Sequence, residues 1–359
     1  MEMVSSFLRG LTAGSTLAAV SAWACYRVLL EPRIHIDYQE STNRFDDVKK
    51  AYPHSTQVLL KYGPPVRSPE ISVFRNHALC YDQQKRIPHW VAEHITKHQV
   101  TGSANRKQSQ FQPDPSVPAM FSAQNNDYFK SGWSRGHMAP AADSKFDQDA
   151  MSETFYLSNI LPQDIDNNAG FWNRFEMYCR DLTKKFDHVW IISGPLFISY
   201  TSKSGKRRIK YEVIGNSEVA VPTHLFKVIV AENDSPNDKT LLGAFVIPNK
   251  PISKEHLLKE YQVPLEYIES KAGLTMLPKL DRKQARNLCK EEGCEVISWE
   301  KFEAFFIGRK LESANTMHRL EKVWKELSDK GIRPDETLIS IYNSKRKELE
   351  GKEVTRKQG

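Results

Sequence analysis

The sequence predicts an α+β protein with one large domain and a smaller helical appendage. Strand-like apolar runs follow one another through the middle of the chain, at residues 71–74, 188–192, 211–214, 224–230 and 243–247. Helical patterns lie between them, and the clearest one covers residues 171–186, where apolar residues share one side. No GxGxxG follows a strand and no GxxxxGK[ST] occurs, so dinucleotide-binding folds and P-loop NTPases are disfavoured.

Length and composition indicate a globular protein with room for a sizeable core. The chain has 359 residues, of which 40% are hydrophobic and 26% charged, and its net charge is +7. A disordered chain would have fewer apolar residues and a more one-sided charge. The mild positive excess is compatible with a polyanionic partner without requiring one.

The cysteines give no disulfide framework. There are 5 of them, scattered along the chain without a CxxC pair. Cys289 and Cys294 are close enough in sequence to pair in an oxidising compartment, but we interpret both as thiols.

The N-terminal segment is the membrane candidate in this sequence. The 17 uncharged residues between Arg9 and Arg27 span about 25 Å as a helix, and flanking apolar residues extend them toward the roughly 30 Å of a bilayer core. The segment is a poor signal peptide and a poor mitochondrial presequence, because it contains an acid and few arginines. We expect residues 1–30 to be an uncleaved anchor or an atypical targeting segment, contacting the membrane through residues 8–30. Residues 31–60 would be a linker.

The C-terminal part predicts a small helical domain. Apolar residues approximate helical spacing over 299–327, and the pattern continues after Pro334 until it fades into a charged tail. We interpret Trp324 and the phenylalanines of this region as the core of that helical part. The predicted boundaries are therefore 61–298 for the α+β domain and 299–359 for the helical part with its tail.

The first cluster with chemical potential is Ser134-Arg135-Gly136-His137. A Gly beside a His lets the backbone turn so that the imidazole projects into a cleft. The neighbouring Arg135 supplies a fork of donors suited to phosphate. His137, if neutral near pH 7, can take a proton from an attacking water.

The second cluster contains four residues spaced by four, which on a helix drift only about 40° per step and line one face: Asn168, Trp172, Glu176 and Arg180. The amide oxygen of Asn168 suits Mg²⁺, a hard cation that keeps most of its waters. Glu176 is placed two turns further on, where it could accept hydrogen bonds from those waters. A base, a hydrated metal and arginine donors are the parts that phosphodiester hydrolysis needs.

Each of these residues also has an ordinary structural interpretation. Asn167-Asn168 would suit a helix N-cap, and Glu176 with Arg180 a surface ion pair worth about 0.3–0.5 kcal/mol. His94 and His98 lack an HExxH frame or a third ligand, so we interpret them as solvated rather than zinc-binding. These interpretations are reasonable one by one, but the joint pattern favours a site.

The two clusters together resemble the active site of the DNA/RNA non-specific endonucleases, the ββα-metal (His-Me finger) nucleases that include endonuclease G. The matching segments are SRGHMAPA at 134–141 and SNILPQDIDNNAGFWNRFE at 158–176. Later segments at 193–197, 221–230 and 244–249 are similar to core strands of that family, so the resemblance covers residues 61 to about 295. The family usually has Asp where this chain has Ser134. With its helical C-terminal extension, the chain most resembles the mitochondrial exo/endonucleases paralogous to endonuclease G.

The resemblance implies a ββα-metal nuclease core and a role for each matching residue. His137 would be the general base, Asn168 the direct protein ligand of Mg²⁺, with Mn²⁺ as a possible substitute, and Glu176 the holder of the metal-bound waters. Asn159 would support the catalytic His or the phosphate. Catalytic or nucleic-acid-binding charge would come from Arg106, at the position expected for the transition-state arginine, and from Arg135, Lys145 and Arg180.

The resemblance also implies an activity and a location. The activity would be metal-dependent hydrolysis of DNA and RNA without sugar specificity, mainly as a 5′-3′ exonuclease with weaker endonuclease activity. The protein would be a homodimer at the mitochondrial inner membrane, acting in DNA repair or degradation. Because Ser134 removes a carboxylate beside the base, the pH optimum and the balance of end and internal cleavage would differ from those of endonuclease G.

Two other hypotheses remain. The protein could be a membrane-tethered nucleic-acid-binding module that kept the fold and lost turnover, although it retains His137, Asn168 and Glu176, and a degenerate site usually loses the base or the ligand first. A phosphodiesterase for a small substrate is disfavoured because cationic residues spread over a wide surface suit an extended polyanion.

Overall fold

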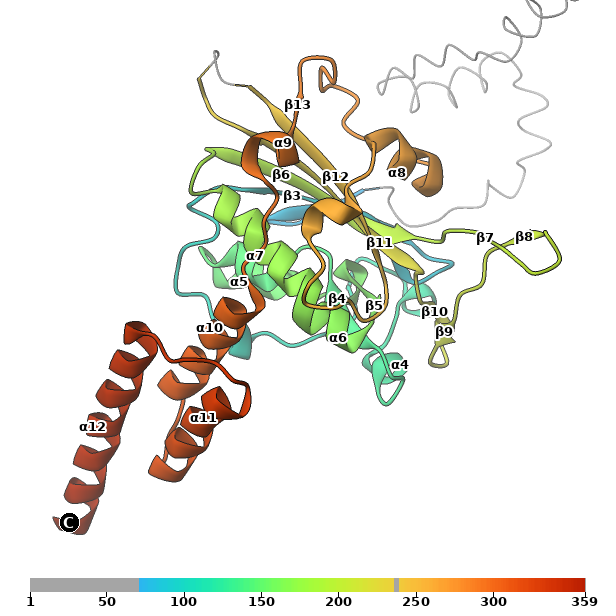
Figure 1. Cartoon of the computed structure of the whole chain (residues 1–359). Coiled ribbons are helices and arrows are strands. Elements are labelled where there is room, and N and C mark those ends of the chain that lie inside the picture. Colours follow the sequence, from blue (N-terminus) through green and yellow to red (C-terminus); the bar gives the residue numbers. More distant parts are fainter. Residues whose placement is uncertain (1–70, 236–238, 359) are drawn as a thin grey trace, which may run out of the picture. The chain divides into compact units, whose positions relative to one another are not determined.

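The computed structural model describes residues 71–235 and 239–358 of the chain (Figure 1). The chain divides into two compact units, Met1–Val66 and Arg67–Gly359, and the described residues belong to the second. The expected anchor and linker at 1–60 lie outside the described residues. Within the described part, none of the helices has both the length and the apolar character that crossing a membrane requires.

A mixed seven-stranded sheet forms the centre of the α+β domain, as predicted. Its strands lie in the order β1 (Ser72–Val73), β2 (His77–Asp82), β3 (Ile87–Ile95), β6 (His188–Leu196), β11 (His224–Glu232), β12 (Leu241–Pro248) and β13 (Arg286–Asn287). All neighbouring strands are antiparallel except β12 and β13. Four predicted apolar runs coincide with strands of this sheet. The β2–β3 hairpin was not predicted, because β2 alternates between buried and half-buried residues and β3 contains a proline.

The two faces of the sheet carry separate apolar cores. On β11, Leu225 and Ile229 face the larger core, whereas Phe226 and Val228 face the smaller one, as expected from the alternation of side chains along a strand. Helix α7 (Asn173–Leu182) and the turn before it pack on the larger core, and α8 (Leu265–Ala272) packs on the smaller one (Figure 1).

The two motif segments form a ββα unit. Strand β4 (Ser134–His137) pairs antiparallel with β5 (Ile160–Gln163), so that Ser134 lies opposite Gln163 and His137 opposite Ile160. The chain then enters α6 (Ile165–Asn167), a π-helical turn η5 (Asn168–Trp172) and α7. The ββα arrangement implied by the sequence resemblance is thus confirmed.

The predicted stripe of residues spaced by four passes through a π-helical turn. Trp172 is fully buried in the larger core, where its ring lies edge-on to Phe175 at 6.0 Å. It still neighbours Glu176 one turn further on, since the Trp172 side chain lowers the pKa of that carboxyl against the effect of burial. The stripe is therefore kept at these two residues, and at Trp172 it faces the core.

Short elements complete the α+β domain. They are η1 (Arg106–Gln108), η2 (Ala119–Phe121), α4 (Asn125–Tyr128), η3 (Ala141–Ser144), α5 (Gln148–Glu153), η4 (Leu157–Asn159), β7 (Tyr200–Thr201), β8 (Arg207–Arg208), β9 (Val213–Ile214), β10 (Val219–Ala220), η6 (Leu258–Tyr261) and α9 (Leu288–Glu292). The run predicted at 211–214 is reduced to β9, which pairs only with β10. Tyr211 and Glu212, at the start of the predicted run, are exposed and lie outside β9.

The C-terminal part is helical, as predicted, but it contains one more break than the apolar pattern suggests. Helices α10 (Trp299–Glu312), α11 (Met317–Asp329) and α12 (Glu336–Gln358) share an apolar core. The break before α11 is fixed by Thr316, whose hydroxyl accepts the backbone N–H of Arg319 at 3.2 Å. Trp324 packs against Tyr342 at 4.3 Å between ring centres, which confirms its core role. Phe305 does not share this role, because it is 47% exposed.

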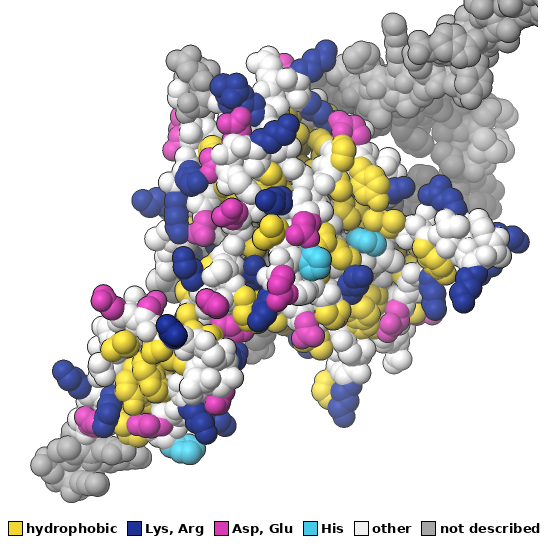
Figure 2. Space-filling model, viewed as in Figure 1, with side chains coloured by type: hydrophobic (Ala, Val, Ile, Leu, Met, Phe, Trp, Pro, Cys, Tyr) yellow, Lys and Arg dark blue, Asp and Glu magenta, His cyan; other side chains and the backbone are white. Residues whose placement is uncertain are grey.

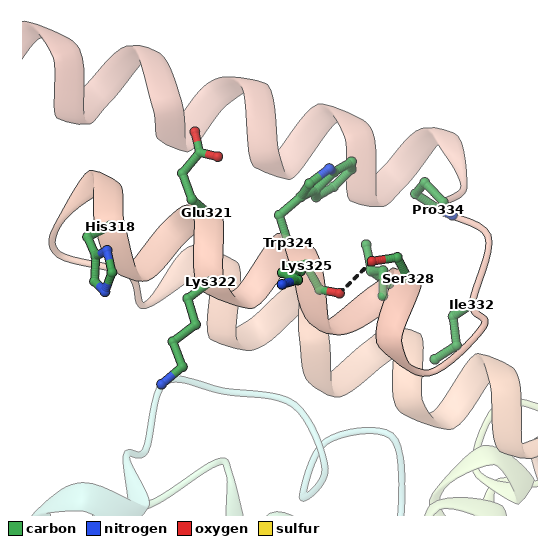
Figure 3. A pocket seen from close by; sticks show the side chains of 9 residues that line it. His318, Glu321, Lys322, Trp324, Lys325, Ser328, Ile332 and Pro334 are labelled. Carbon is green, nitrogen blue, oxygen red and sulfur yellow. Dashed lines mark hydrogen bonds between the residues drawn. The ribbon is translucent and has the colours of Figure 1, made fainter.

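A groove of about 610 Å³ lies along α11 and the segment that follows it (Figure 3). Its lining includes the ring of Trp324, the side chains of Lys322 and Lys325, and Ile332. None of the residues predicted to form the site lines this groove, so the candidate site must be sought at the ββα unit.

Two interpretations from the sequence are wrong. Cys289 and Cys294 form a disulfide. Gly293, in the left-handed conformation at the end of α9, turns the chain back so that these two residues meet. His94 is not simply solvated either: its Nε2 lies 2.9 Å from Nδ1 of His188, whose Nε2 lies 2.9 Å from Asp234. His98, by contrast, is exposed.

Candidate active site

His137 ends strand β4 inside an aromatic enclosure. The ring centre of Phe111 lies 5.2 Å from that of His137, and Phe155 meets it edge-on at 5.0 Å. The Nε2 atom is buried without a hydrogen-bond partner among the described residues. Burial, and then the positive charge of Arg106, lower the pKa of His137 to about 3. The imidazole is therefore neutral at physiological pH and able to accept a proton.

Asn159 holds the backbone that follows His137. It is fully buried, and its Oδ1 accepts the N–H of Ala139 at 2.9 Å. Its Nδ2 donates to the carbonyls of Ala139 at 2.9 Å and Thr154 at 2.8 Å, while its own carbonyl accepts the N–H of Met138 at 3.0 Å. Both amide protons are used within the protein, so the geometry favours the predicted support of His137 over contact with phosphate.

Asn168 is linked to strand β4 through Ser134. The Ser134 hydroxyl donates to the carbonyl of Gln163 at 2.7 Å, and Nδ2 of Asn168 donates to Ser134 Oγ at 3.0 Å. The N-cap of helix α6 is Asp164, whose side chain accepts the backbone N–H of Asn167 at 2.8 Å. Neither Asn167 nor Asn168 has this capping role. The helix-cap interpretation is therefore wrong.

Two buried asparagines that sequence reasoning did not assign to the site fasten the ββα unit to the end of β12. Nδ2 of Asn167 donates to the carbonyls of Pro248 and Lys250 at 3.0 and 2.8 Å. Nδ2 of Asn249 donates to the carbonyls of Pro162 and Pro222 at 3.0 and 2.9 Å. Asn249 follows an apolar strand, where an asparagine is ordinary turn chemistry, so no local signal distinguishes its role.

Glu176 lies on α7, near the buried Lys227 of strand β11. Burial raises the pKa of Glu176 to about 7, and the positive charges of Lys227 and Arg180 oppose this rise. Lys227 is 1% exposed, and its ammonium group donates to Ser193 Oγ at 2.7 Å. A lysine within the apolar run of β11 was the signal that could have revealed this arrangement, since a buried cation needs polar partners.

Arg180 pairs with a different acid from the one considered from the sequence. Its guanidinium lies 2.8 Å from the Asp143 carboxylate, and the two side chains are 18% and 1% exposed. The ion-pair partner of Arg180 is therefore Asp143, and not Glu176 as the surface-pair interpretation had it. Glu93 lies in the same buried group of charges, and burial together with the nearby Asp143 raises its pKa well above the usual range.

Arg106 and Arg135 approach the enclosure around His137 from two segments. The guanidinium of Arg106 lies 5.9 Å from the ring centre of Phe155, and that of Arg135 lies 4.8 Å from the ring centre of Phe111. Because both rings contact His137, the two arginines border the same enclosure. Among the described residues, neither arginine forms an ion pair within 4.0 Å.

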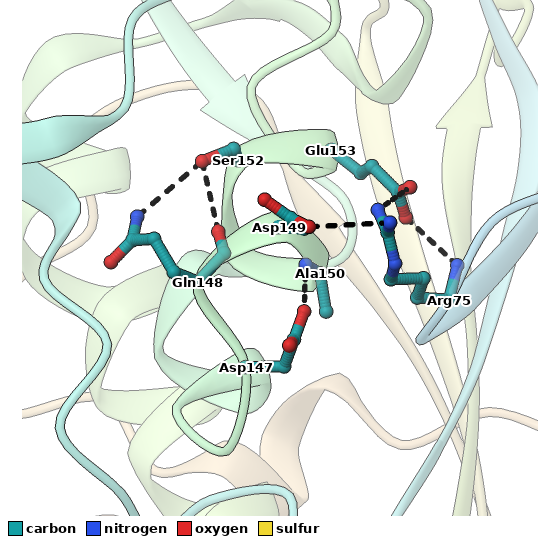
Figure 4. Close-up of polar contacts among 7 residues, drawn as sticks. All are labelled: Arg75, Asp147, Gln148, Asp149, Ala150, Ser152 and Glu153. Atoms are coloured by element: carbon teal, nitrogen blue, oxygen red, sulfur yellow. Dashed lines mark hydrogen bonds and ion pairs between the residues drawn. The ribbon is translucent and has the colours of Figure 1, made fainter.

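Helix α5, whose contact with Arg75 is drawn in Figure 4, also holds the loop that carries Arg106. Oε1 of Gln148 accepts the N–H of Asn105 at 2.7 Å, and Nε2 of Gln148 donates to Ser109 Oγ at 3.1 Å. The helix is anchored in turn by Arg75, which lies 2.6 Å from Glu153. Lys145 is exposed on the adjoining turn, and its carbonyl accepts the N–H of Ala104 at 3.2 Å. Lys145 therefore adjoins the Arg106 loop.

Comparison with known proteins identifies the family. Residues 55–283 match the DNA/RNA non-specific endonuclease family, and residues 297–345 match the C-terminal domain of the endo/exonuclease EXOG. The chain belongs to the DNA/RNA non-specific endonucleases. The predicted resemblance is thereby confirmed.

Several members of this endonuclease family are similar over most of their length. "Nuclease EXOG, mitochondrial" of Danio rerio is 50% identical over 299 residues, covering 83% of this chain and 87% of that protein. The Xenopus laevis protein of the same name is 46% identical, covering 97% and 94%. Among solved structures, the crystal structure of the EndoG/EndoGI complex contains a chain of 39% identity, with a TM-score of 0.59, covering 66% of this chain and 96% of that one.

The metal implied by this endonuclease family fits the donors present. No group of three His, Cys, Asp or Glu in the described part of the chain is placed to hold a metal ion, so a cation at the ββα unit would depend on fewer protein ligands and on water. The amide proton of Asn168 that faces Ser134 is already used, which leaves its carbonyl oxygen for a hard cation. Asn168 would be the direct ligand and Glu176 would act through water.

Proposed function

We propose that this protein is a Mg²⁺-dependent nuclease that hydrolyses phosphodiester bonds of DNA and RNA. The observation that carries the proposal is the joint arrangement at the ββα unit: a neutral His137 ends β4, and Ser134 at the other end of the same strand is hydrogen-bonded to Asn168 on the facing helix. A base and a ligand for a hydrated cation thus belong to one small unit.

Each residue has a task in the proposed reaction. His137 takes the proton from the attacking water, and Asn159 keeps the backbone at His137 in place. Asn168 binds Mg²⁺, or Mn²⁺ in its place, and Glu176 orients the water ligands. The cation, when bound, stabilises negative charge on the phosphate and on the leaving oxygen. Arg106 and Arg135 donate to the phosphate oxygens.

The proposed substrate contacts read the backbone of the nucleic acid and not its bases. Arg106, Arg135 and Lys145 supply positive charge around the His137 enclosure, which favours a phosphate-binding surface with little base specificity. Arg180 was predicted as a fourth contact. Since its guanidinium is paired with Asp143, we assign it an indirect role through that pair.

The finer properties are proposed from the relatives. Proteins named mitochondrial nuclease EXOG cover most of the chain, which supports a mitochondrial location. We propose 5′-3′ exonuclease activity with weaker endonuclease activity on the sequence resemblance alone. We further propose attachment to the inner membrane through residues 8–30, a homodimer, and a role in mitochondrial DNA repair or degradation.

The experiment that tests the activity uses DNA duplexes labelled at the 5′ end or internally, and the matching RNA. The protein is incubated with each substrate in Mg²⁺ and in EDTA. We expect cleavage only with Mg²⁺, and early release of the 5′ label indicates attack from the end. Binding without cleavage in Mg²⁺ and in Mn²⁺ would instead support the second hypothesis, a tethered nucleic-acid-binding module.

A further inference from the structure

We propose that Ser134 is a positioning residue that orients Asn168 toward the cation. The inference rests on the proposed function, in which Asn168 binds a divalent metal. Ser134 is the position at which this chain departs from the usual Asp of the family, and the proposal gives the serine a role in orienting the metal ligand.

The direction of the first hydrogen bond follows from the chemistry of its two groups. Ser134 Oγ lies 2.7 Å from the carbonyl oxygen of Gln163. A carbonyl can only accept, so the single hydroxyl proton of Ser134 must point at Gln163. Only the lone pairs of Oγ are then left for any other neighbour.

The second hydrogen bond is thereby fixed as well. The side-chain amide of Asn168 lies against Ser134 Oγ at 3.0 Å. Because Oγ has no proton left to give, Asn168 must present Nδ2, and a flipped amide would place two acceptors together. The two groups of a planar amide point in different directions, so Oδ1 of Asn168 is turned away from Ser134. The orientation of the proposed metal ligand is thus decided by one hydroxyl.

Serine does here what an aspartate cannot do. An ionised carboxylate could accept from Asn168, but it has no proton to donate to Gln163. Strands β4 and β5 are in close contact at this point, since a Cβ on Gly136 would lie 2.2 Å from Gln163 Oε1. Ser134 therefore connects the backbone of β5, its own strand β4 and Asn168 on the π-helical turn in one chain of hydrogen bonds.

The test compares Ser134→Ala, which removes both bonds, with Ser134→Thr, which keeps the hydroxyl. Binding of Mn²⁺ alone to the metal-free full-length protein is measured by electron paramagnetic resonance, without substrate. We expect Ser134→Ala to weaken Mn²⁺ binding about tenfold, the lower end of the range for residues that support a metal ligand, and Ser134→Thr to stay within about twofold of the parent. Cleavage assays should show the same shift in half-saturating Mg²⁺, with the KM for DNA unchanged.

The control separates failure of this inference from failure of the proposed function. In the background of Asn168→Ala, Ser134→Ala should have no further effect on Mn²⁺ binding, because the two residues act as a pair. Unchanged Mn²⁺ binding in Ser134→Ala, while Asn168→Ala loses it, would overturn the positioning role and leave the metal site intact. If Asn168→Ala also binds Mn²⁺ like the parent, the proposed metal site itself is wrong.

A separate observation concerns the β7–β8 hairpin, from which we infer a second contact for single-stranded nucleic acid. Figure 2 shows Lys and Arg side chains gathered over this hairpin. No Asp or Glu occurs from Phe197 to Tyr211. The exposed cations of the hairpin are Lys203, Lys206, Arg207, Arg208 and Lys210.

The hairpin combines this charge with exposed aromatic rings. Tyr200 and Tyr211 are 48% and 46% exposed, although Tyr211 also packs against Phe197 at 4.8 Å between ring centres. In sites for single-stranded nucleic acid, bases stack on aromatic side chains while nearby cations bind the phosphates. The base of the hairpin lies close to the candidate site, because the Glu212 carboxylate accepts Nε1–H of Trp133 at 3.1 Å, directly before β4. A strand leaving the site can therefore be held by the hairpin.

The test measures binding of a labelled single-stranded oligonucleotide in EDTA, so that it does not depend on cleavage. The triple variant Lys206→Gln, Arg207→Gln, Arg208→Gln should reduce the slope of log Kd against log salt by about 2, that is three lost phosphate contacts at about 0.7 each. A matched triple variant with Lys254→Gln, Lys259→Gln and Lys279→Gln should leave the slope unchanged. The same slope in both triple variants would overturn the inference. Binding to anionic lipid vesicles is measured alongside, and a hairpin variant that loses only vesicle binding while keeping oligonucleotide binding would overturn it too.

Discussion

The ammonium group of Lys227 lies 4.8 Å from the ring centre of Trp172, inside the contact between the central sheet and the helix that carries Glu176. The lysine is 1% exposed, and its positive charge lowers the pKa of Glu176 against the effect of burial. A buried cation beneath the candidate site therefore helps to keep a carboxylate above it ionised.

Lys227→Met keeps the side-chain length but removes this charge. We expect the free energy of unfolding to fall by about 2–4 kcal/mol at pH 8, because buried carboxylates lose a compensating cation. The loss should be smaller at pH 5.5, since the folded-state pKa of Glu176 lies above its unfolded value and the protonated carboxyl no longer needs the cation. Urea unfolding at the two pH values measures this. Lys184→Met, on an exposed lysine, should change little, and an equal loss at both pH values would contradict the account.

His77 makes the stability depend on pH in the opposite sense. Burial lowers its pKa to about 4 from 6.5, so its contribution is fully present above pH 6.5 and is lost as the pH falls toward 4. Phenylalanine cannot titrate. Between pH 7.5 and pH 5 we therefore expect the free energy of unfolding to fall by about 2 kcal/mol less in His77→Phe than in the parent. Chemical denaturation of both proteins at each pH provides the measurement. Parallel pH profiles would show that His77 is not responsible.

Asn249 is expected to matter for both stability and activity. Asn249→Ala leaves the buried carbonyls of Pro162 and Pro222 without their donor, at a cost of about 2–4 kcal/mol in the free energy of unfolding. Because the ββα unit then loses its fastening to β12, kcat should fall more than the KM for DNA rises. Asn126→Ala, at an exposed position, serves as the control. Full stability of Asn249→Ala would contradict the fastening role.

Arg106 is expected to act on the transition state. Arg106→Ala should lower kcat by about 10²–10³-fold, with the half-saturating Mg²⁺ concentration unchanged, because the guanidinium borders the enclosure of His137 and not Asn168. Steady-state kinetics at several Mg²⁺ concentrations separate the two effects. A change confined to DNA affinity would reduce Arg106 to a backbone contact.

Local patterns in the sequence were sufficient for the strands that are buried on both faces and for the order of the two motif segments. The apolar runs of β6, β11 and β12 are easily recognised, because both of their faces are covered. The β2–β3 hairpin could not be recognised in this way, since half of the residues of β2 are only partly buried. The break before α11 depends on one capping residue, Thr316, inside a continuous apolar pattern.

The parts of the candidate site that escaped prediction depend on partners distant in sequence. Glu93, Asp143 and Lys227 come from three separate segments and form one buried group of charges only after the sheet and helix pack together. The π-helical turn at Asn168–Trp172 was also not predicted, because no residue pattern distinguished it from an α-helix. The Cys289–Cys294 disulfide likewise depends on the left-handed backbone at Gly293.

The central claim is that His137 is the base and Asn168 the metal ligand of a nuclease. The most direct test is the single-turnover cleavage of a 5′-labelled duplex at saturating protein and Mg²⁺, comparing the parent with His137→Ala and with Asn168→Ala. The account predicts that the parent cuts and that each variant is at least about 10³-fold slower while still binding the duplex. Cleavage within tenfold of the parent by either variant would contradict it.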